Sequence, residues 1–255
     1  MIERLVGDAV VAVDVREDVP DAPLFPEEED YIAFSVQQRR IEFATARVCA
    51  RRALARLGVP PVPVLPGARG EPVWPQGVVG SITHCTGYRG VVLGRAAEVL
   101  TIGIDAEPNE PLKPGILPEV SLPAEQARVR QFRAAAPGIC WDRLLFSAKE
   151  SVYKAWFGLA RRSLGFDQAQ IAFHRDGGPA GGVDAALDAG SFTARLLVRG
   201  PLVQSVELRG FSGRWMVCDG IVLTSIVLLR DPAARPAPLG PTHHQVHAGA
   251  FAGRV

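Results

Sequence analysis

The chain has 255 residues, of which 47% are hydrophobic and 22% are charged. These proportions are those of ordinary globular proteins, so they exclude a disordered chain and a small disulfide scaffold. The 28 basic and 27 acidic residues nearly cancel, which argues against nucleic-acid binding through bulk charge. No apolar run reaches the length of about 18 residues that spans a bilayer, and the N-terminus lacks a secretory pattern. We therefore expect a cytoplasmic protein that has no contact with a membrane.

The first part of the chain predicts one strand and one long helix. Residues 8–15 have the apolar character of a buried strand, and the acidic, proline-containing residues 20–30 indicate an exposed loop. Ser35 and Gln38 form a capping box that begins a helix, and Gly58 ends it. We expect this helix over residues 35–57.

A row of arginines follows one edge of this helix. Arg40, Arg47 and Arg51 are seven and four residues apart, so they lie within about 20 degrees of one line. One interpretation is a solvated edge whose aliphatic stems cover apolar surface. The other is a clamp for an anion, and the helical spacing alone leaves both open.

A loop and several strands are predicted next. Residues 59–77 are too rich in proline and glycine for regular structure, and they contain a tight turn, Arg69-Gly70-Glu71-Pro72. Three strands that form a small meander are expected at residues 78–84, 90–93 and 100–107.

The second part repeats this order. Residues 108–137 are rich in proline, glutamate and alanine and indicate a junction, whereas residues 141–159 have apolar side chains in helical steps of three and four. Asp219-Gly220 predicts a two-residue hairpin. Strands are expected at residues 169–174, 193–198, 211–218 and 221–229.

Each half therefore has one long helix followed by a meander. We predict an α+β fold of two pseudo-twofold halves, residues 1–112 and 113–230, in which a long helix packs on a small, mainly antiparallel sheet and a cleft separates the halves. Residues 231–255 are expected to form a flexible tail whose histidines bind no metal. The four scattered cysteines are expected to be reduced thiols. We expect a monomer, because one chain supplies both halves of the cleft.

Acidic and lysine residues mark the candidate chemistry. In a strand, Asp105 and Glu107 point to the same side, where they either hold Mg²⁺ or are two exposed acids at a strand end. Lys149 and Lys154 stand out because the chain has only one other lysine, and an ammonium group is a point charge suited to phosphate. Glu150 and Lys154 have the spacing of an ordinary surface ion pair, but their apolar flanks favour a half-buried position.

His84 lies in a structured, motif-like stretch, Gly80–Cys85. Three such blocks, Gly80–Cys85, Ile102–Pro108 and Phe146–Trp156, resemble those of the Sfp-type 4'-phosphopantetheinyl transferases in order and spacing. With the Arg69 turn and the arginine-bearing helix, the resemblance covers about residues 30–229 and looks most like the enterobactin-synthase-component and mycobacterial type. It implies that coenzyme A and Mg²⁺ bind between two α+β halves. It also implies transfer of the phosphopantetheine arm from coenzyme A to a serine of an apo carrier protein, with release of adenosine 3',5'-bisphosphate.

The resemblance further implies roles for individual residues. Asp105, Glu107 and Glu150 would hold the metal, and Glu150, Asp105 and Lys154 would be catalytic, with Glu150 as the base toward the carrier serine. Lys149 and Lys154 would contact the phosphates. His84 would bond the diphosphate, and Arg47, Arg51 and Arg69 would hold the 3'-phosphate and adenosine. The remaining expected cofactor-binding residues are Gly70, Glu71, Pro72 and Ser81.

Two positions depart from the pattern of this family. Arg69 stands where lysine is common, and Ala106 stands between the two acids where a large aliphatic residue is common. The first keeps the charge, and the second leaves room at the metal.

Two alternatives to a transferase are compatible with the same residues. One is a Mg²⁺-dependent phosphohydrolase or nuclease that uses Asp105, Glu150 and Lys154. The other is a non-catalytic module that binds coenzyme A or another nucleotide. The sequence does not distinguish between carrier proteins of fatty-acid, polyketide and nonribosomal-peptide synthesis, the last including siderophore synthesis.

Overall fold

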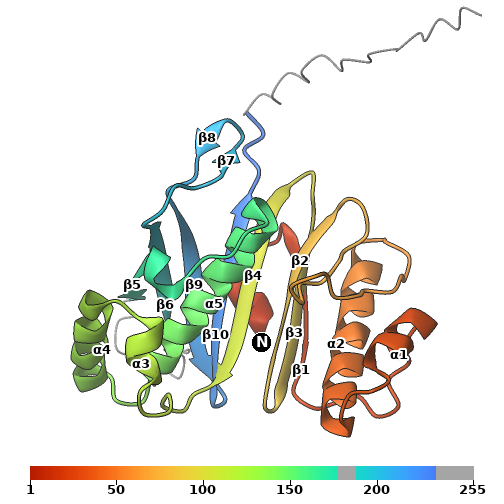
Figure 1. Ribbon diagram of the computed structural model, residues 1–255, viewed down its shortest axis with the longest axis horizontal. Coiled ribbons are helices and arrows are strands. Elements are labelled where there is room, and N and C mark those ends of the chain that lie inside the picture. The colour runs from red at the N-terminus through yellow and green to blue at the C-terminus, as the bar shows by residue number, and fades with distance from the viewer. Residues whose placement is uncertain (177–187, 234–255) are drawn as a thin grey trace, which may run out of the picture.

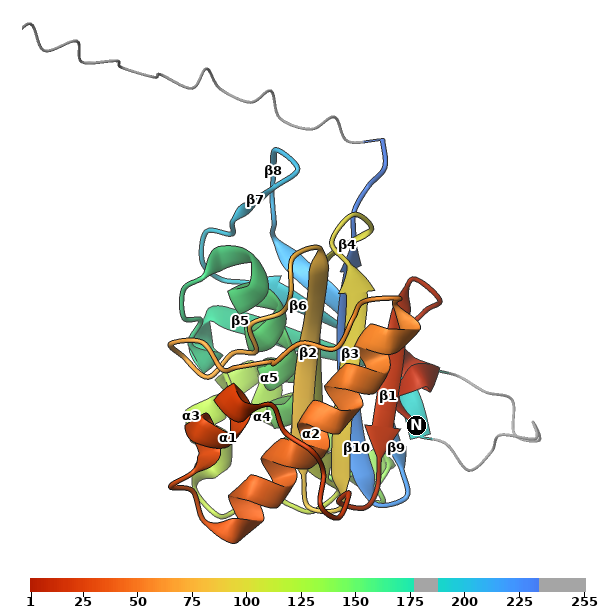
Figure 2. The ribbon, with the colours of Figure 1, turned by 90° about the vertical axis from the view of Figure 1, so that its right-hand side faces the viewer.

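The computed structural model describes residues 1–176 and 188–233. In the first half, three antiparallel strands form a sheet in the order β1-β3-β2. The long helix α2 crosses one face of this sheet, with the short α1 beside it (Figure 2). The elements of this half are η1 (Ile2–Leu5), β1 (Val10–Val15), α1 (Pro26–Ile32), α2 (Gln37–Arg56), β2 (Val78–Cys85) and β3 (Tyr88–Arg95).

The second half contains a larger antiparallel sheet in the order β4-β10-β9-β6-β5. Helix α5 lies on this sheet, and the small hairpin β7-β8 projects from one end (Figure 1). The helices are α3 (Ile116–Val120), α4 (Pro123–Ala135), α5 (Trp141–Ala160) and η2 (Phe166–Gln168). The strands are β4 (Val99–Pro108), β5 (Ala169–Arg175), β6 (Asp188–Leu196), β7 (Leu202–Val203), β8 (Val206–Glu207), β9 (Gly210–Cys218) and β10 (Ile221–Leu229).

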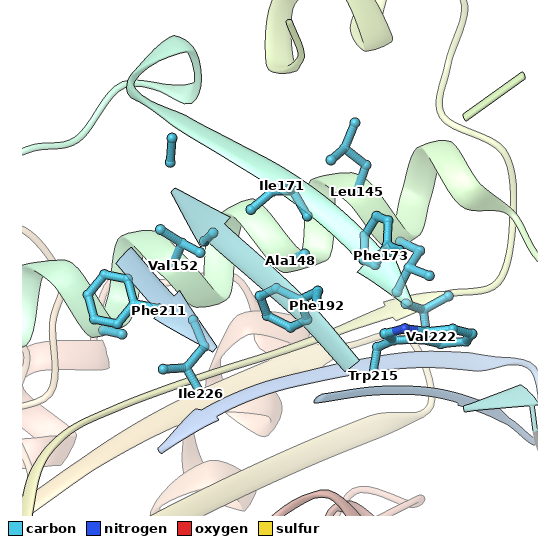
Figure 3. Close-up of a cluster of buried hydrophobic side chains, with 14 of the residues drawn as sticks. Leu145, Ala148, Val152, Ile171, Phe173, Phe192, Phe211, Trp215, Val222 and Ile226 are labelled. Atoms are coloured by element: carbon cyan, nitrogen blue, oxygen red, sulfur yellow. The ribbon is translucent and has the colours of Figure 1, made fainter. Parts of the chain in front are cut away.

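The core of the second half forms between α5 and its sheet. Leu145, Ala148 and Val152 repeat in steps of three and four along α5, and they face Phe192 and Trp215 of the sheet (Figure 3). All five side chains are buried, and burial of a large apolar side chain contributes about 1.5 to 3 kcal/mol. The predicted helix over residues 141–159 is therefore confirmed, because its apolar stripe matches the helical period.

The two halves share a longer repeat than the sequence indicates. Each half begins with a strand, continues through a long helix, and returns in a hairpin beside the first strand. In the first half these elements are β1, α2 and β2-β3, and in the second they are β4, α5 and β9-β10. Strands β5 and β6 extend the second sheet beyond this common unit.

Strand β4 corrects the predicted organisation. We expected residues 100–107 to form a meander with the two preceding strands, but β4 pairs with β10 from Val99 to Pro108. The sheet of the second half thus begins before the predicted boundary at residue 112. Residue pattern identifies a strand from its own side chains, whereas its partner depends on distant packing.

Several element bounds also differ from expectation. Residues 26–32 form α1 instead of a loop, because Pro26 occupies the first turn and Glu28 caps the helix. Helix α2 begins at Gln37 without the side-chain cap expected from Ser35. The predicted junction contains α3 and α4. The Asp219-Gly220 hairpin is confirmed, since both residues have the positive φ angles that this turn requires.

Two other expectations concern cysteines and membranes. Cys49, Cys85, Cys140 and Cys218 are all free thiols, as predicted. In the part of the chain that the structure describes, no helix combines the length and apolar character needed to cross a bilayer. The predicted tail lies almost entirely outside the described residues, which end at residue 233.

The halves meet where β2 runs beside β4. Ser81 Oγ accepts a hydrogen bond from the Ile104 amide at 3.2 Å, and Thr83 Oγ1 accepts one from the Ala106 amide at 2.9 Å. Gly103 lets α5 approach β4 closely, because a Cβ at this position would overlap the carbonyl oxygen of Ser151. The first two contacts join the motif Gly80–Cys85 to the motif Ile102–Pro108 at the seam between the halves.

Candidate functional site

A cavity of about 420 Å³ lies at this seam. Its walls come from α2, the loop before β2, strand β2, the start of β4 and helix α5. The predicted site residues that line it are Arg47, Arg69, Gly70, Glu71, Pro72, Ser81, His84, Glu150 and Lys154. The structure therefore brings side chains from both halves to one space, as the predicted cleft requires.

Asp105 is buried and does not line the cavity itself, but it bonds Lys154, which does. Its Oδ1 accepts a hydrogen bond from Lys154 Nζ at 2.8 Å and a long one from Thr83 Oγ1 at 3.4 Å. Lys154 also donates to the Ile104 carbonyl at 2.9 Å. The second carboxylate oxygen, Oδ2, is buried and has no hydrogen-bond partner. A buried charged oxygen without a partner is costly, so Asp105 has unused capacity to bind a cation.

Glu150 and Glu107 are close enough to Asp105 to respond to its charge. Burial raises the pKa of Glu150, and the negative charge of Asp105 raises it further, against the opposing effect of Lys154. The pKa of Glu107 is raised by the same two causes, although Arg143 opposes them through an ion pair at 2.9 Å. The three predicted metal carboxylates thus share one electrostatic environment.

A complete set of metal ligands is not assembled in this structure. Among residues 1–176 and 188–233, no group of three or more acidic, histidine or cysteine side chains is placed to hold an ion. Lys154 and Arg143 instead occupy one oxygen each of Asp105 and Glu107. The unpartnered Asp105 Oδ2 nevertheless fits a hard cation, because such ions prefer carboxylate oxygens.

His84 lies at the rim of the cavity, beside a cation that the sequence analysis missed. Its Nε2 is 3.2 Å from Arg39 Nη1. Desolvation and the charge of Arg39 lower the pKa of His84, so the ring is neutral at pH 7 and accepts this hydrogen bond. Arg39 could have been found from periodicity, because Arg39, Phe43, Ala46 and Arg47 are spaced by four, three and one and face the cavity together.

Arg47 is held rigidly in the cavity wall. Its Nε donates to the Val64 carbonyl at 2.6 Å, and its guanidinium lies 3.8 Å from the centre of the Phe43 ring. Burial lowers the pKa of Arg47 to about 10, so the group stays charged at neutral pH. The wall thus presents a fixed positive charge to any bound anion.

Comparison with known proteins shows the family of the chain. Residues 27–94 match the 4'-phosphopantetheinyl transferase N-terminal domain, and residues 101–197 match the 4'-phosphopantetheinyl transferase superfamily. The chain is 52% identical over 231 residues to 4'-phosphopantetheinyl transferase Svp of Streptomyces mobaraensis, with 89% of each chain covered. It is 48% identical over 228 residues to 4'-phosphopantetheinyl transferase PptT of Mycobacterium tuberculosis, covering 89% of this chain and 96% of that protein. Enterobactin synthase component D of Salmonella typhimurium is 34% identical over 216 residues, with 82% and 81% covered.

The chain belongs to the 4'-phosphopantetheinyl transferase family. It is therefore an enzyme that modifies carrier proteins, and both the hydrolase and the non-catalytic alternatives are set aside. The first matched region ends in β3 and the second begins in β4, and β4 is the first strand of the second sheet.

The Arg69 turn forms part of the wall of the transferase cavity. Gly70 adopts a positive φ of 83 degrees, and Glu71 Oε2 accepts a hydrogen bond from the Arg69 amide at 3.0 Å. The Arg69 guanidinium donates to Ser163 Oγ, which follows α5 in the other half. Glu71 therefore shapes the turn, while Arg69 spans the two halves.

Two cations predicted to bind coenzyme A are not on the wall of this cavity. Arg51 pairs with Glu28 at 3.0 Å. Lys149 Nζ donates to Glu125, to the Phe166 carbonyl and to the Ala169 carbonyl at 2.6 to 2.8 Å. An ammonium group has three N–H donors, so this environment already uses all of them.

A second, smaller cavity of about 160 Å³ borders the same helix. Glu150 and Tyr153 line both cavities, and the rest of the smaller one is mostly apolar, with Leu164 and Phe166 among its walls. Tyr153 carried no sequence signal beyond its place in the motif. Glu150 therefore borders two cavities, the larger one between the halves and the smaller one beside α5.

Proposed function

We propose that this transferase binds coenzyme A in the cavity between its halves, and that Glu150 accepts the proton of the carrier serine as the phosphopantetheine arm is transferred. The observation that carries the proposal is that Glu150 and Lys154 line a cavity that also holds arginines, and that Lys154 bonds one oxygen of the half-satisfied Asp105.

The cations of the cavity fit the phosphates of coenzyme A. Arg39, Arg47, Arg69 and Lys154 line it together with the neutral His84, and Arg69 also bonds Ser163 across the two halves. Arginine forks bind phosphate oxygens in pairs, whereas lysine supplies a point charge. We assign Lys154 and His84 to the diphosphate and the arginines to the 3'-phosphate and adenosine end.

Asp105, Glu150 and Glu107 are the residues proposed to hold Mg²⁺. When bound, Mg²⁺ would polarise the diphosphate and stabilise charge on the departing bisphosphate. Asp105 offers its unpartnered Oδ2, and the pKa values of Glu150 and Glu107 are raised by burial first and by the negative charge of Asp105 second. A divalent cation would relieve this repulsion.

Glu150 is suited to remove a proton. Because burial and Asp105 raise its pKa above the ordinary value of 4.5, it is a stronger base than an exposed glutamate. A positioned base contributes roughly 10²- to 10⁴-fold to a rate. Lys154 lies one helical turn away on the same face and would hold the phosphate that leaves.

The proposed partners follow from this chemistry. The acceptor is a serine of an apo acyl or peptidyl carrier protein, and cations at the rim would steer an acidic carrier to the cleft. We propose that the transferase acts as a monomer, since one chain supplies both walls. Its free thiols fit a reducing cytoplasm.

The experiment is incubation with coenzyme A, Mg²⁺ and an apo carrier protein, followed by intact-mass measurement of the carrier. We expect the wild type to add the arm, and Glu150→Gln to lose about 100-fold or more of the rate while still binding coenzyme A. Glu98→Gln, at an exposed turn between β3 and β4, is the matched control. Equal rates for Glu150→Gln and wild type would contradict the role of Glu150.

A further inference from the structure

Arg143, near the start of α5, directs its guanidinium at a single short segment. Its Nη1 donates to Glu107 Oε2 at 2.9 Å, its Nε donates to the Glu110 carbonyl at 3.0 Å, and its Nη2 donates to the Pro111 carbonyl at 3.2 Å. Two of the three acceptors are backbone atoms, so the position of the guanidinium does not depend on its bond to Glu107. The Arg143 side chain is therefore held in one conformation.

The same segment is tied to the start of α5 by further hydrogen bonds. The Leu112 amide donates to Asp142 Oδ2 at 3.0 Å, and the Cys140 amide donates to Asn109 Oδ1 at 2.9 Å. Asn109 also donates to the Gly138 carbonyl at 2.9 Å. The end of β4 and the start of α5 are thus joined, so the position of Glu107 is fixed relative to the helix that carries Glu150.

Glu107 is bonded in the same way as Asp105. Arg143 binds only Oε2 of Glu107, and no hydrogen bond reaches its Oε1 from any described residue. Lys154 and Thr83 bind only Oδ1 of Asp105, and Oδ2 is left without a partner. Each carboxylate therefore has one oxygen held by a cation and one oxygen available.

We propose that Arg143 is a positioning residue that holds Glu107 by one oxygen and thereby presents the other to the metal. This inference rests on the proposed function, because it assumes that Mg²⁺ binds at these carboxylates. Arg143 itself touches neither the metal nor the substrate. Hydrogen-bond partners of metal-binding carboxylates typically control metal affinity by about 10- to 100-fold.

The test compares Arg143→Gln with the wild type in two measurements. Titration calorimetry follows binding of Mn²⁺ to the protein in the absence of coenzyme A, and a transfer assay gives the half-saturating Mg²⁺ concentration. We expect both to weaken about ten-fold, while kcat at saturating Mg²⁺ stays close to that of the wild type. Unchanged metal binding would overturn the proposal, and so would tighter binding, which would identify Arg143 as a competitor of the metal.

Two further variants complete the test. Arg214→Gln removes an exposed arginine–carboxylate pair of the same length, with Asp176 at 2.9 Å, and it should leave Mn²⁺ binding unchanged. If Arg143→Gln does not fold, Arg143→Lys replaces it in the test. Lysine keeps the positive charge but cannot make the three hydrogen bonds of the guanidinium. Weaker Mn²⁺ binding by this variant supports the proposal, and binding equal to that of the wild type overturns it. A wild type that transfers the arm without any divalent ion would instead refute the proposed metal site.

Discussion

Glu28 in the first half and Glu125 in the second occupy matching positions. Each is the third residue of a short helix that begins with proline, Pro26 in α1 and Pro123 in α4. Each caps its own helix, through the amides of Phe25 and Leu122 at 3.0 and 2.7 Å. The repeat between the halves therefore extends to individual side chains, although the two stretches share little sequence beyond the proline and the glutamate.

Both glutamates also join three segments of their half. Glu28 accepts a hydrogen bond from the Val64 amide at 2.9 Å and pairs with Arg51 of α2. Glu125 accepts one from the Ile171 amide at 2.6 Å and pairs with Lys149 of α5 at 2.8 Å. In each half, one of the cations that the resemblance assigned to coenzyme A, Arg51 or Lys149, is thus the partner of a buried structural glutamate.

The two pairs differ in their access to water. The Lys149 and Glu125 side chains are each 2% exposed, whereas Arg51 is 16% exposed beside a Glu28 that is fully buried. Arg51 also donates to the Pro23 carbonyl at the surface. Loss of the cation should therefore be more costly in the second half, because water can reach the place of Arg51 more readily than that of Lys149.

The largest effect is expected for Lys149→Met. This change leaves the Glu125 carboxylate buried without its cation, and breaking a buried pair in this way costs about 3 to 5 kcal/mol. Urea unfolding measures the loss. If Lys149 chiefly bound coenzyme A, the variant would instead keep its stability and show a raised KM for coenzyme A.

The double variant Glu125→Gln/Lys149→Met sharpens this prediction. It removes both charges, so it should be less destabilised than the sum of the two single variants. Additive losses would mean that the two side chains do not interact.

A smaller effect is expected for Arg51→Met. Arg51 is partly exposed, so water can replace part of its interaction with Glu28, and a hydrogen bond to a charged group contributes about 2 kcal/mol. The same urea experiment should place this variant between wild type and Lys149→Met. The KM of Arg51→Met for coenzyme A should change less than that of Arg47→Met, since Arg47 lines the cavity and Arg51 does not. A larger change in KM for Arg51→Met would indicate that Arg51 binds coenzyme A.

These pairs show where sequence reasoning succeeds and where it ends. Local signals predicted α5 and the Asp219-Gly220 hairpin, because a helical stripe and a positive-φ turn are properties of neighbouring residues. Helix periodicity also placed Arg51 and Lys149 correctly on their helices. It did not reveal Glu28 and Glu125, which come from segments more than 20 residues away.

The same distinction holds at the site. The alternation of β4 put Asp105 and Glu107 on one side, and it agrees with a pKa of Glu107 that burial and the charge of Asp105 raise. The pairing of β4 with β10 could not be predicted, because it depends on packing of both sheets. Arg143 went unnoticed because two of its three acceptors are backbone carbonyls, which carry no sequence signal.

Glu150 contrasts with both structural glutamates, and this contrast leads to the smallest predicted effect. Glu28 and Glu125 each have a cation and two amide donors, whereas Glu150 is half-buried and receives no hydrogen bond to its carboxylate from any described residue. Its raised pKa means that, without metal, the folded protein binds this proton more tightly than the unfolded chain does. The contribution of Glu150 to the free energy of unfolding must then fall as the pH rises from about 4.5 through the pKa of the folded state.

Glu150→Gln removes this titration. At pH 7 without metal, the variant should therefore be at least as stable as the wild type, and the difference should shrink toward pH 5. Added Mg²⁺ should stabilise the wild type more than the variant, because a ligand that binds the folded state alone raises its stability. Urea midpoints at the two pH values, with and without Mg²⁺, measure the stability difference at pH 7, its change toward pH 5 and the effect of Mg²⁺. A Glu150→Gln protein that is less stable than the wild type at pH 7 would place Glu150 with Glu28 and Glu125, as a support of the fold.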